Sequence, residues 1–206
     1  FYRYFESYGL TQKTGIDLPG ESDSIYVHKG DFNLVSLASE SFGQTMSITP
    51  IQMISTFCAS VNGGNLVTPH VVKQVVDQNG DIVKSYGTDV KRQVISEETS
   101  KQMQYVLQQV VEGSNAAVPG YRIAGKSGTA QKLGRLPERV YVASFVGAVP
   151  ADKPQYALMV LVDEPTDGTY YGGVICGPIF AQIMREAIPY LGISPEYTEE
   201  ELKTLT

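Results

Sequence analysis

The chain has 206 residues, a formal net charge of -6 and a pI near 4.9. This acidic balance, without any run of Lys or Arg that could neutralise phosphates, argues against a nucleic-acid-binding protein. No apolar stretch approaches the ~20 residues that a transmembrane helix needs. The two His and two Cys show no metal-ligand spacing, so we expect no metal and no cofactor. A hydrophobic fraction of 42% is an ordinary globular value and predicts one good-sized core or part of a larger domain.

The chain opens on a segment, residues 1–9, that reads like the end of a helix with Gly9 just past its last turn. A chain that starts inside a helix is expected to be a piece of a longer protein. An irregular, Pro- and Gly-containing segment follows to about residue 35. Asp31 or Asn33 is expected to cap a short helix there.

Two longer helices are predicted from apolar positions at helical spacing. Thr49 and Pro50 fit the cap and first position of one helix, which residues 62–64 end. Ser96 is expected to cap the other, which Gly113 ends. The expected buried stripes are Ile51, Ile54, Phe57, Cys58 and Val61 in the first helix, and Met103, Val106, Leu107, Val110 and Val111 in the second.

Between these helices, residues 67–85 predict a β-hairpin. Two β-rich runs flank Asn79-Gly80, which is a strong signal for a two-residue turn.

From residue 121 the pattern changes to strands. The first covers residues 122–131, the second 141–150 and the third 156–162, with a turn at 151–154 that makes the last two strands antiparallel. The last two strands are apolar almost without interruption, which predicts burial on both faces and helices on both sides of the sheet. The expected fold class is therefore α/β (α+β), an antiparallel sheet flanked by helices on both faces.

The last part of the chain is a glycine- and tyrosine-rich loop, a helix and a tail. Pro178 is expected to start the helix and Pro189 to end it. The loop at 168–173 either borders a binding groove beside the first strand or is an ordinary sheet-to-helix crossover. The residues 194–206 are acidic and polar and predict a linker or surface tail.

One strand carries the residues most suited to chemistry. Ser127 and Thr129 are two apart, so both hydroxyls project from one face, while Lys126 and Gly128 alternate onto the other. The flanking glycines let another chain approach the backbone closely. Two hydroxyls, an ammonium and backbone N–H groups together suit an anion or a peptide carboxylate.

Lys126-Ser127-Gly128 resembles the third motif, Lys-(Thr/Ser)-Gly, of the penicillin-binding proteins and class A β-lactamases. Residues 14–21, Thr-Gly-Ile-Asp-Leu-Pro-Gly-Glu, are similar to a segment of class B penicillin-binding proteins. The stretches Phe-Gly-Gln at 42–44 and Thr-Pro-Ile-Gln at 49–52 resemble the loop and long helix behind the active site of that family. Asp-Glu-Pro at 163–165 and Tyr-Tyr-Gly-Gly at 170–173 also match its pattern. The resemblance covers nearly the whole chain and is strongest to cell-division and sporulation transpeptidases.

The nucleophile of that family is the serine of a Ser-x-x-Lys motif, and no serine in this chain has Lys three residues later. Two literal matches to other motifs are set aside. Ser60-Val61-Asn62 fits Ser-x-Asn, the second motif of that family, but lies at a predicted helix end. Lys13-Thr14-Gly15 fits the third motif but precedes a loop. The resemblance therefore implies that residues 1–193 are the C-terminal portion of a transpeptidase domain, with an incomplete penicillin-binding/β-lactamase-like fold.

By resemblance, the whole protein would cross-link peptidoglycan stem peptides by serine acyl transfer at D-Ala-D-Ala and would be acylated by β-lactams. Lys126 would assist proton transfer, and the backbone N–H of Thr129 would be one oxyanion-hole donor. Lys126, Ser127, Gly128 and Thr129 would bind the substrate or drug.

The resemblance also implies a place in the cell and partners. The parent would be anchored to the extracytoplasmic face of the membrane by an N-terminal segment absent from this chain, and would meet other cell-wall synthesis or division proteins. This chain alone would be inactive. An alternative is a non-catalytic scaffold of the same fold that binds peptidoglycan or division proteins.

Overall fold

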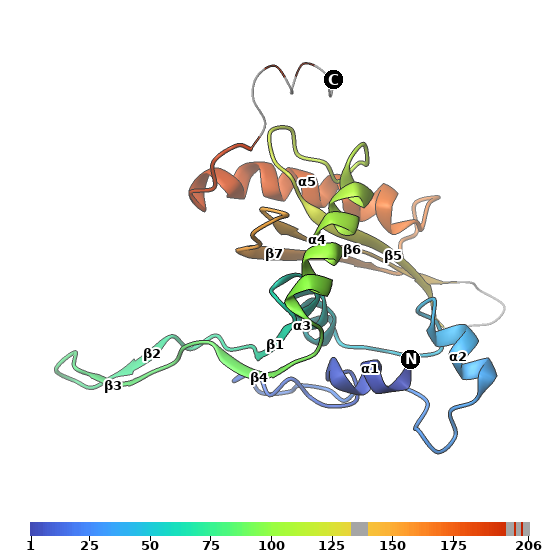
Figure 1. Cartoon of the computed structure of the whole chain (residues 1–206), viewed down its shortest axis with the longest axis horizontal. Coiled ribbons are helices and arrows are strands. Elements are labelled where there is room, and N and C mark those ends of the chain that lie inside the picture. The colour runs from blue at the N-terminus through green and yellow to red at the C-terminus, as the bar shows by residue number, and fades with distance from the viewer. Residues whose placement is uncertain (133–139, 197–199, 201–202, 204–206) are drawn as a thin grey trace. The chain divides into compact units, whose positions relative to one another are not determined.

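The computed structural model describes residues 1–132, 140–196, 200 and 203, and these fall into two compact units, 1–97 and 98–206 (Figure 1). The mixed helix and antiparallel-sheet architecture predicted from the sequence is confirmed. The first unit contains α1 (Tyr2–Ser7), α2 (Leu34–Glu40), α3 (Pro50–Val61), β1 (Asn65–Thr68), β2 (Gln74–Val76), β3 (Ile82–Ser85) and β4 (Asp89–Gln93).

Local capping explains where the helices of the first unit begin. Asn33, one of the two expected caps, accepts hydrogen bonds from the N–H groups of Val35 and Ser36 at 2.9 and 3.2 Å and starts α2. Thr49 caps α3 as predicted. The sequence reading overlooked a reciprocal bond, in which the Thr49 N–H donates to Gln52 Oε1 at 3.0 Å while the Gln52 N–H donates to Thr49 Oγ1.

The predicted hairpin is present, but its loop is one residue longer than predicted. The Asp77 N–H donates to the Asp81 carbonyl at 2.9 Å, so the loop has three residues rather than the two centred on Asn79-Gly80. The reason is the Asp77 carboxylate, which accepts from the N–H groups of Asn79 and Asp81 at 2.8 and 3.0 Å. The pairing of β1 with β4 was not predicted.

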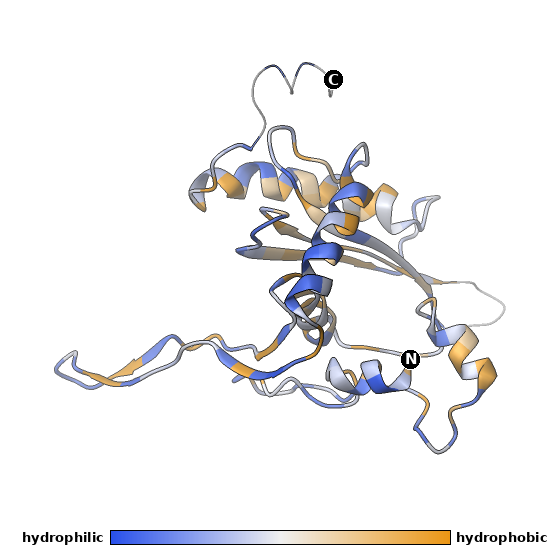
Figure 2. Ribbon diagram, viewed as in Figure 1, coloured by the Kyte–Doolittle hydropathy of each residue, from blue (hydrophilic) through white to orange (hydrophobic). Residues whose placement is uncertain are grey.

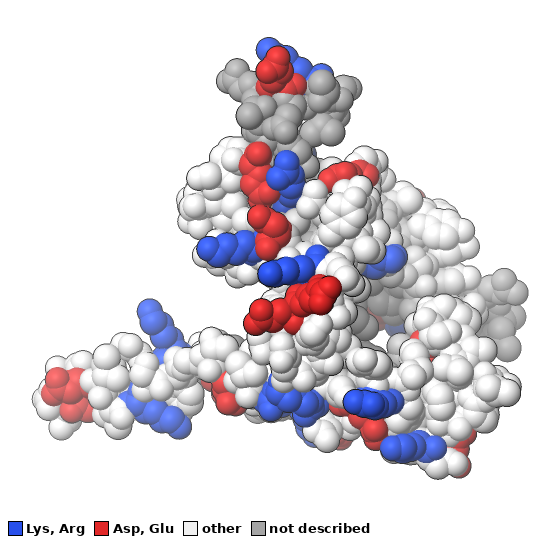
Figure 3. All heavy atoms as spheres, viewed as in Figure 1, with Lys and Arg blue, Asp and Glu red and all other residues white. Residues whose placement is uncertain are grey.

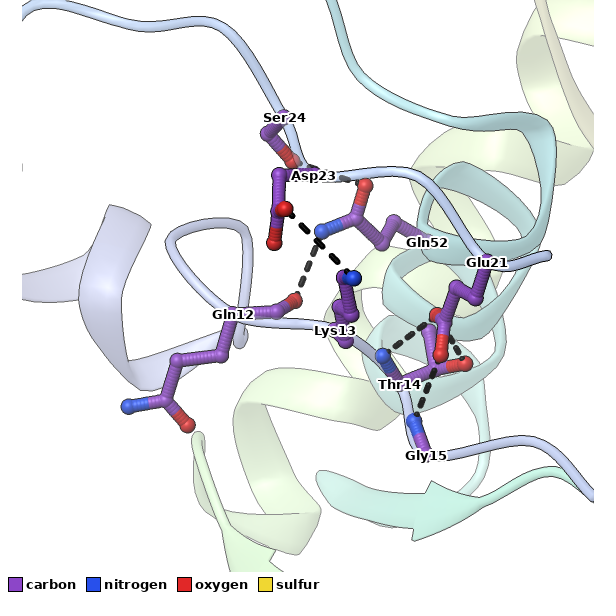
Figure 4. Close-up of polar contacts among 8 residues, drawn as sticks. All are labelled: Gln12, Lys13, Thr14, Gly15, Glu21, Asp23, Ser24 and Gln52. Atoms are coloured by element: carbon purple, nitrogen blue, oxygen red, sulfur yellow. Dashed lines mark hydrogen bonds and ion pairs between the residues drawn. The ribbon is translucent and has the colours of Figure 1, made fainter.

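A polar network fixes the loop between α1 and α2 (Figure 4). The Glu21 carboxylate accepts from the N–H and hydroxyl of Thr14, both at 2.6 Å, and from the Gly15 N–H at 3.0 Å. Gln52, which is 2% exposed, accepts from the Ser24 hydroxyl at 2.7 Å and donates to the Gln12 carbonyl at 2.7 Å. The loop is therefore closed on itself by Glu21 and attached to α3 by Gln52.

Replacing Glu21 by Gln should lower the free energy of unfolding by about 1–2 kcal/mol at neutral pH, because a charged acceptor loses its ionic character. Burial raises the pKa of Glu21, but the bonds from Thr14 and Gly15 outweigh burial, so the net shift is downward from 4.5. A lowered pKa stabilises the fold above 4.5, and this stabilisation is lost as the pH falls through the folded-state pKa. Denaturant unfolding of the parent and of Glu21→Gln, measured from neutral to acid pH, gives this contribution. The difference between their free energies of unfolding should vanish in acid. Glu186→Gln, at an exposed position, is the matched control and should show no such convergence.

The second unit contains most of α4 (Glu97–Val111), then β5 (Ala124–Gln131), β6 (Tyr141–Val149), β7 (Tyr156–Asp163) and α5 (Gly172–Tyr190). The sheet order is β5-β6-β7 with antiparallel neighbours, as predicted. Helix α5 packs across this sheet, and Phe180, Met184 and Ile188 of α5 join Phe145 and Val149 of β6 in the core.

Burial on both faces holds for β6 but not for β7. On β6, Phe145 and Val149 are buried beside α5, and Val146 and Ala148, which alternate with them, are buried on the opposite face. β7 is the outer strand of the described sheet, and Leu161 is 41% exposed. An outer strand has a neighbour on one side only, which explains the difference.

Two helix details also differ from the prediction. Within the expected stripe of α4, Leu107 and Val111 are buried while Val106 and Val110 are exposed. Helix α5 begins at Gly172, six residues before Pro178, and continues past Pro189. Proline has a helix-compatible φ and costs a helix one internal hydrogen bond, and packing of the segment before Pro178 against the sheet extends the helix backwards.

The tail expected at 194–206 lies largely outside the described residues. Its first described residues are bound: the Glu196 N–H donates to the Gly120 carbonyl at 2.9 Å, and its carboxylate lies 3.7 Å from Arg122.

Candidate functional site

The register of β5 decides which of its backbone groups are available to a ligand. The Lys132 N–H donates to the Val140 carbonyl at 2.9 Å, immediately past the ends of β5 and β6. Hydrogen-bonded pairs alternate in an antiparallel ladder, so the even-numbered residues of β5 bond to β6. The N–H and C=O groups of Ser127 and Thr129 therefore point to the edge of β5 that is unpaired within the described sheet.

The side chains of β5 divide between the two faces as the alternation predicts. Thr129 Oγ1 accepts a hydrogen bond at 3.0 Å from the N–H of Gly172, the first residue of α5. Ser127 faces the same helix start, because a Cβ built on Gly173 would lie 3.7 Å from Ser127 Cβ. Both hydroxyls thus lie on the α5 face of the sheet, beside the open edge of β5.

Lys126 projects from the opposite face, is exposed, and curls back to the same edge. Its Nζ donates to the carbonyl of Ser127 at 2.8 Å. This carbonyl is one of the outward-pointing groups, so the ammonium lies at the edge where a ligand strand would pair.

Glycines allow α5 to touch the sheet backbone directly. A Cβ on Gly172 would overlap with the carbonyl oxygens of Gly128 and Ser144 and would lie 2.9 Å from the Ser144 nitrogen. Real Cβ atoms do not approach so closely, so only glycine brings the helix start to β5 here.

This contact gives Thr129 a defined orientation. A hydroxyl oxygen that accepts the Gly172 N–H keeps its own O–H free to donate to a third group. The N-terminus of a 19-residue helix also carries the positive end of its dipole, which favours an anion beside it. An anionic ligand at the edge of β5 would therefore meet a donor hydroxyl, an ammonium and a favourable dipole.

Three tyrosines group beside the far end of β5. The rings of Tyr141 and Tyr170 stack with centroids 4.0 Å apart, and the hydroxyls of Tyr170 and Tyr171 lie 3.3 Å apart. The hydrogen bond with Tyr171 raises the pKa of Tyr170 to about 12, so the Tyr170 hydroxyl is neutral at physiological pH. Tyr141 pairs with Gln131, the last residue of β5, so the aromatic surface continues from this strand.

A lysine that the sequence reading overlooked clamps the same end of the sheet. Lys132 Nζ lies 2.6 Å from the Asp163 carboxylate and 2.8 Å from that of Glu164. Hydrogen bonds with Asp163 and then Glu164 raise the pKa of Lys132, so it stays charged. The clamp joins the end of β5 to the end of β7. No sequence pattern marks it, because its partners are some thirty residues away.

The two literal motif matches play other parts. Asn62 ends α3, donating from Nδ2 to the Asn65 carbonyl at 2.8 Å and accepting from the Asn65 N–H at 2.8 Å. Thr14 belongs to the loop closed by Glu21. Neither was predicted to be catalytic, and both serve the local fold.

Within the described part of the chain, no three His, Cys, Asp or Glu side chains cluster as they would around a metal ion. Among the same residues, every helix is too short or too polar to cross a bilayer.

Residues 1–185 match the family model for the penicillin-binding protein transpeptidase domain. Stage V sporulation protein D of Bacillus subtilis is 43% identical over 98% of this chain and 32% of that protein. The peptidoglycan D,D-transpeptidase FtsI of Escherichia coli is 30% identical over 93% of this chain and 32% of that protein. The crystal structure of penicillin-binding protein 3 from Mycobacterium tuberculosis, complexed with ampicillin, superposes with a TM-score of 0.84 at 28% identity, covering 96% of this chain and 47% of that one. The chain thus spans about a third of the length of these curated relatives.

Proposed function

The chain belongs to the penicillin-binding protein transpeptidase family, and from that membership we propose that it supplies the carboxylate-binding and oxyanion-binding half of a peptidoglycan D,D-transpeptidase. The observation that carries the proposal is the open edge of β5. There the outward N–H of Thr129, its oriented hydroxyl and the Lys126 ammonium come together. The ligands would be stem peptides ending in D-Ala-D-Ala, and β-lactams.

In the proposed reaction, a serine from the rest of the protein attacks the carbonyl carbon of the penultimate D-Ala. The tetrahedral intermediate places negative charge on the former carbonyl oxygen, and the outward N–H of Thr129 donates to that oxygen. The C–N bond breaks, the terminal D-Ala leaves as the free amino acid after accepting a proton, and an amine of a second stem peptide takes the acyl group. Lys126 supplies positive potential and assists proton transfer at the serine.

The two hydroxyls of β5 bind the terminal carboxylate of the substrate in this proposal. The carboxylate accepts hydrogen bonds from Ser127 and Thr129, and the bond from the Gly172 N–H fixes the Thr129 oxygen beforehand. Gly128 keeps the β5 backbone bare, so an extended peptide can pair with the outward groups of Ser127 and Thr129. The tyrosine surface formed by Tyr141, Tyr170 and Tyr171 lies beside the end of β5, next to where this peptide would pair.

Labelling with a fluorescent penicillin tests the proposal in the full-length protein that contains this chain. A covalent adduct on a serine outside these 206 residues is expected. If no serine of the full-length protein is labelled, the proposed transpeptidase activity is refuted. The 206-residue chain alone should remain unlabelled, and its acylation would contradict the assignment of the nucleophile to the rest of the protein.

Thr129→Val should slow acylation about 10–100-fold, because it removes the hydroxyl that holds the carboxylate and leaves the Gly172 N–H without an acceptor. Thr129→Ser keeps the hydroxyl and the backbone donor and should stay close to the parent rate. Stopped-flow acylation by a chromogenic cephalosporin measures both. Equal rates for the two variants would exclude a role for the hydroxyl.

A non-catalytic scaffold of the same fold is the second candidate, favoured by the lack of any Ser-x-x-Lys in these 206 residues. It would bind peptidoglycan or division proteins through the same edge. The labelling experiment separates the two, since a scaffold retains carboxylate binding without an adduct.

The proposed place of action is the extracytoplasmic face of the membrane, with the anchor in another part of the protein. Other cell-wall synthesis or division proteins are the proposed partners there.

A further inference from the structure

The β2–β3 hairpin exposes several apolar side chains, which is unfavourable for a hairpin that has no binding partner. It forms a two-stranded sheet of its own, separate from the β1–β4 pair (Figure 1). Val75 and Val76 of β2 are 44% and 48% exposed, and Ile82 and Val83 of β3 are 61% and 68% exposed. Figure 2 shows hydrophobic colouring along this hairpin, residues 73–86, which we call the arm. Two-stranded hairpins are marginal in water, and a third strand or a cover stabilises them.

The outer edge of β2 is regular and open. The Tyr86 N–H donates to the Lys73 carbonyl and the Asp77 N–H to the Asp81 carbonyl, both at 2.9 Å, so residues 73 and 77 face β3. Alternation along the strand then points the N–H and C=O groups of Gln74 and Val76 outward. These groups offer two donors and two acceptors on an edge that pairs with no other strand in the described part of the chain.

The base of the hairpin and the outer edge of β3 are less suited to pairing with another strand. At its base, the Asp17 carboxylate accepts from the N–H groups of Val71 and Val72 at 2.8 and 2.9 Å. On β3, Val83 is an extra residue, because the register shifts between Val75 and Val76. Such bulges disrupt edge pairing. The open edge is therefore limited to residues 73–77 of β2.

The charges along this edge are self-complementary. The sequence Lys73-Gln74-Val75-Val76-Asp77 has a cation at one end, an anion at the other and Val75 at its centre. Figure 3 shows acidic side chains at the far end of the arm and lysines behind them. We propose that β2 pairs antiparallel with β2 of a second copy of the protein, about a twofold axis at Val75.

In this arrangement every group on the edge finds a partner. Val75 lies opposite Val75 of the second copy, and Gln74 lies opposite Val76, with their outward backbone groups bonded. Lys73 lies opposite Asp77 of the second copy, once on each side of the axis. Asp77 uses Oδ1 for the two turn bonds, so Oδ2 can accept from the lysine. The product is a four-stranded sheet, β3-β2-β2-β3, in place of two hairpins.

The charge pattern favours a second copy over an unrelated strand. A foreign strand would need an anion opposite Lys73 and a cation opposite Asp77, and a second copy in this register supplies both. The contact is small, so we expect a weak dimer that forms at high local concentration.

Cysteine cross-linking in the full-length protein tests the register. Two cysteines at position 75 would have Cα atoms about 4.5 Å apart in a non-hydrogen-bonded pair, which suits a disulfide. Val75→Cys should give about tenfold more disulfide-linked dimer under mild oxidation than Val83→Cys. Val83 is more exposed but lies on the strand away from the axis. The unmodified protein reports any background from Cys58 and Cys176.

Charge variants test the pairing without a cross-link. In sedimentation at about 0.1 mM, Lys73→Asp and Asp77→Lys should each weaken the dimer about tenfold or more, because like charges then face each other. Mixing the two variants should restore association, since each then supplies what the other lacks. Lys84→Glu, on β3, should leave the dimer intact.

Equal cross-linking at positions 75 and 83, or a parent protein that stays monomeric at this concentration, would overturn the proposal. Binding of the arm to some other protein without self-association would overturn it as well. Penicillin labelling of the same samples keeps this outcome separate from the proposed catalytic function.

Discussion

Gly172→Ala is expected to destabilise the full-length protein by about 3–5 kcal/mol and to abolish most acylation by β-lactams. The new methyl group would overlap with the carbonyl oxygens of Gly128 and Ser144, which are backbone atoms of β5 and β6 and cannot move aside alone. Helix α5 would have to lift from the sheet, and the Gly172 N–H would leave Thr129 Oγ1. Strand β5 would lose the support that orients Thr129, whose hydroxyl is the proposed carboxylate donor.

Thermal unfolding, followed by acylation kinetics at a permissive temperature, measures both effects. A loss of this size corresponds to a fall in melting temperature of about 10 °C. Gly173→Ala is the matched control, because its Cβ would lie an ordinary 3.7 Å from Ser127 Cβ. If both variants melt alike, the contact between α5 and the sheet does not require glycine at position 172.

Lys126→Met is expected to lower the acylation rate about 10²–10³-fold while leaving the melting temperature nearly unchanged. Lys126 is exposed, and its ammonium donates to the neighbouring Ser127 carbonyl, so the fold loses little. The reaction loses the cation at the edge where the carboxylate and the attacking serine would meet.

Lys153→Met controls for a change of net charge, because Lys153 is an exposed lysine of the turn between β6 and β7. Its acylation rate should match the parent. Lys126→Arg keeps the positive charge, but arginine does not readily give up a proton. A rate between those of the parent and Lys126→Met would therefore separate the electrostatic contribution of Lys126 from its role in proton transfer. A Lys126→Met rate within about threefold of the parent would remove Lys126 from the proposed machinery.

What the sequence could predict was governed by local periodicity. The alternation of Lys126, Ser127, Gly128 and Thr129 assigns faces by itself, and the structure agrees. Caps such as Thr49 and Asn33 act over three residues, so the starts of α2 and α3 were also readable.

Features that depend on residues far apart in the chain could not be predicted from the sequence. The contact of Gly172 with Gly128 joins positions 44 apart, and nothing near Gly172 indicates which strand it meets. The start of α5 was misplaced for the same reason, because Pro178 is a strong local signal while packing against the sheet decides where the helix begins. The hairpin turn was misplaced because the Asp77 side chain, rather than Asn79-Gly80, organises it.

The hydrogen bond between Gly172 and Thr129 makes one oxygen common to a helix start and to the proposed ligand site. By thermodynamic reciprocity, whatever holds α5 against the sheet tightens carboxylate binding, and bound carboxylate holds α5 by the same free energy. The amide hydrogen of Gly172 would then exchange with solvent more slowly whenever the site is occupied. If the site acts as proposed, substitutions along α5 that never touch a ligand would change the acylation rate through the seating of this helix alone.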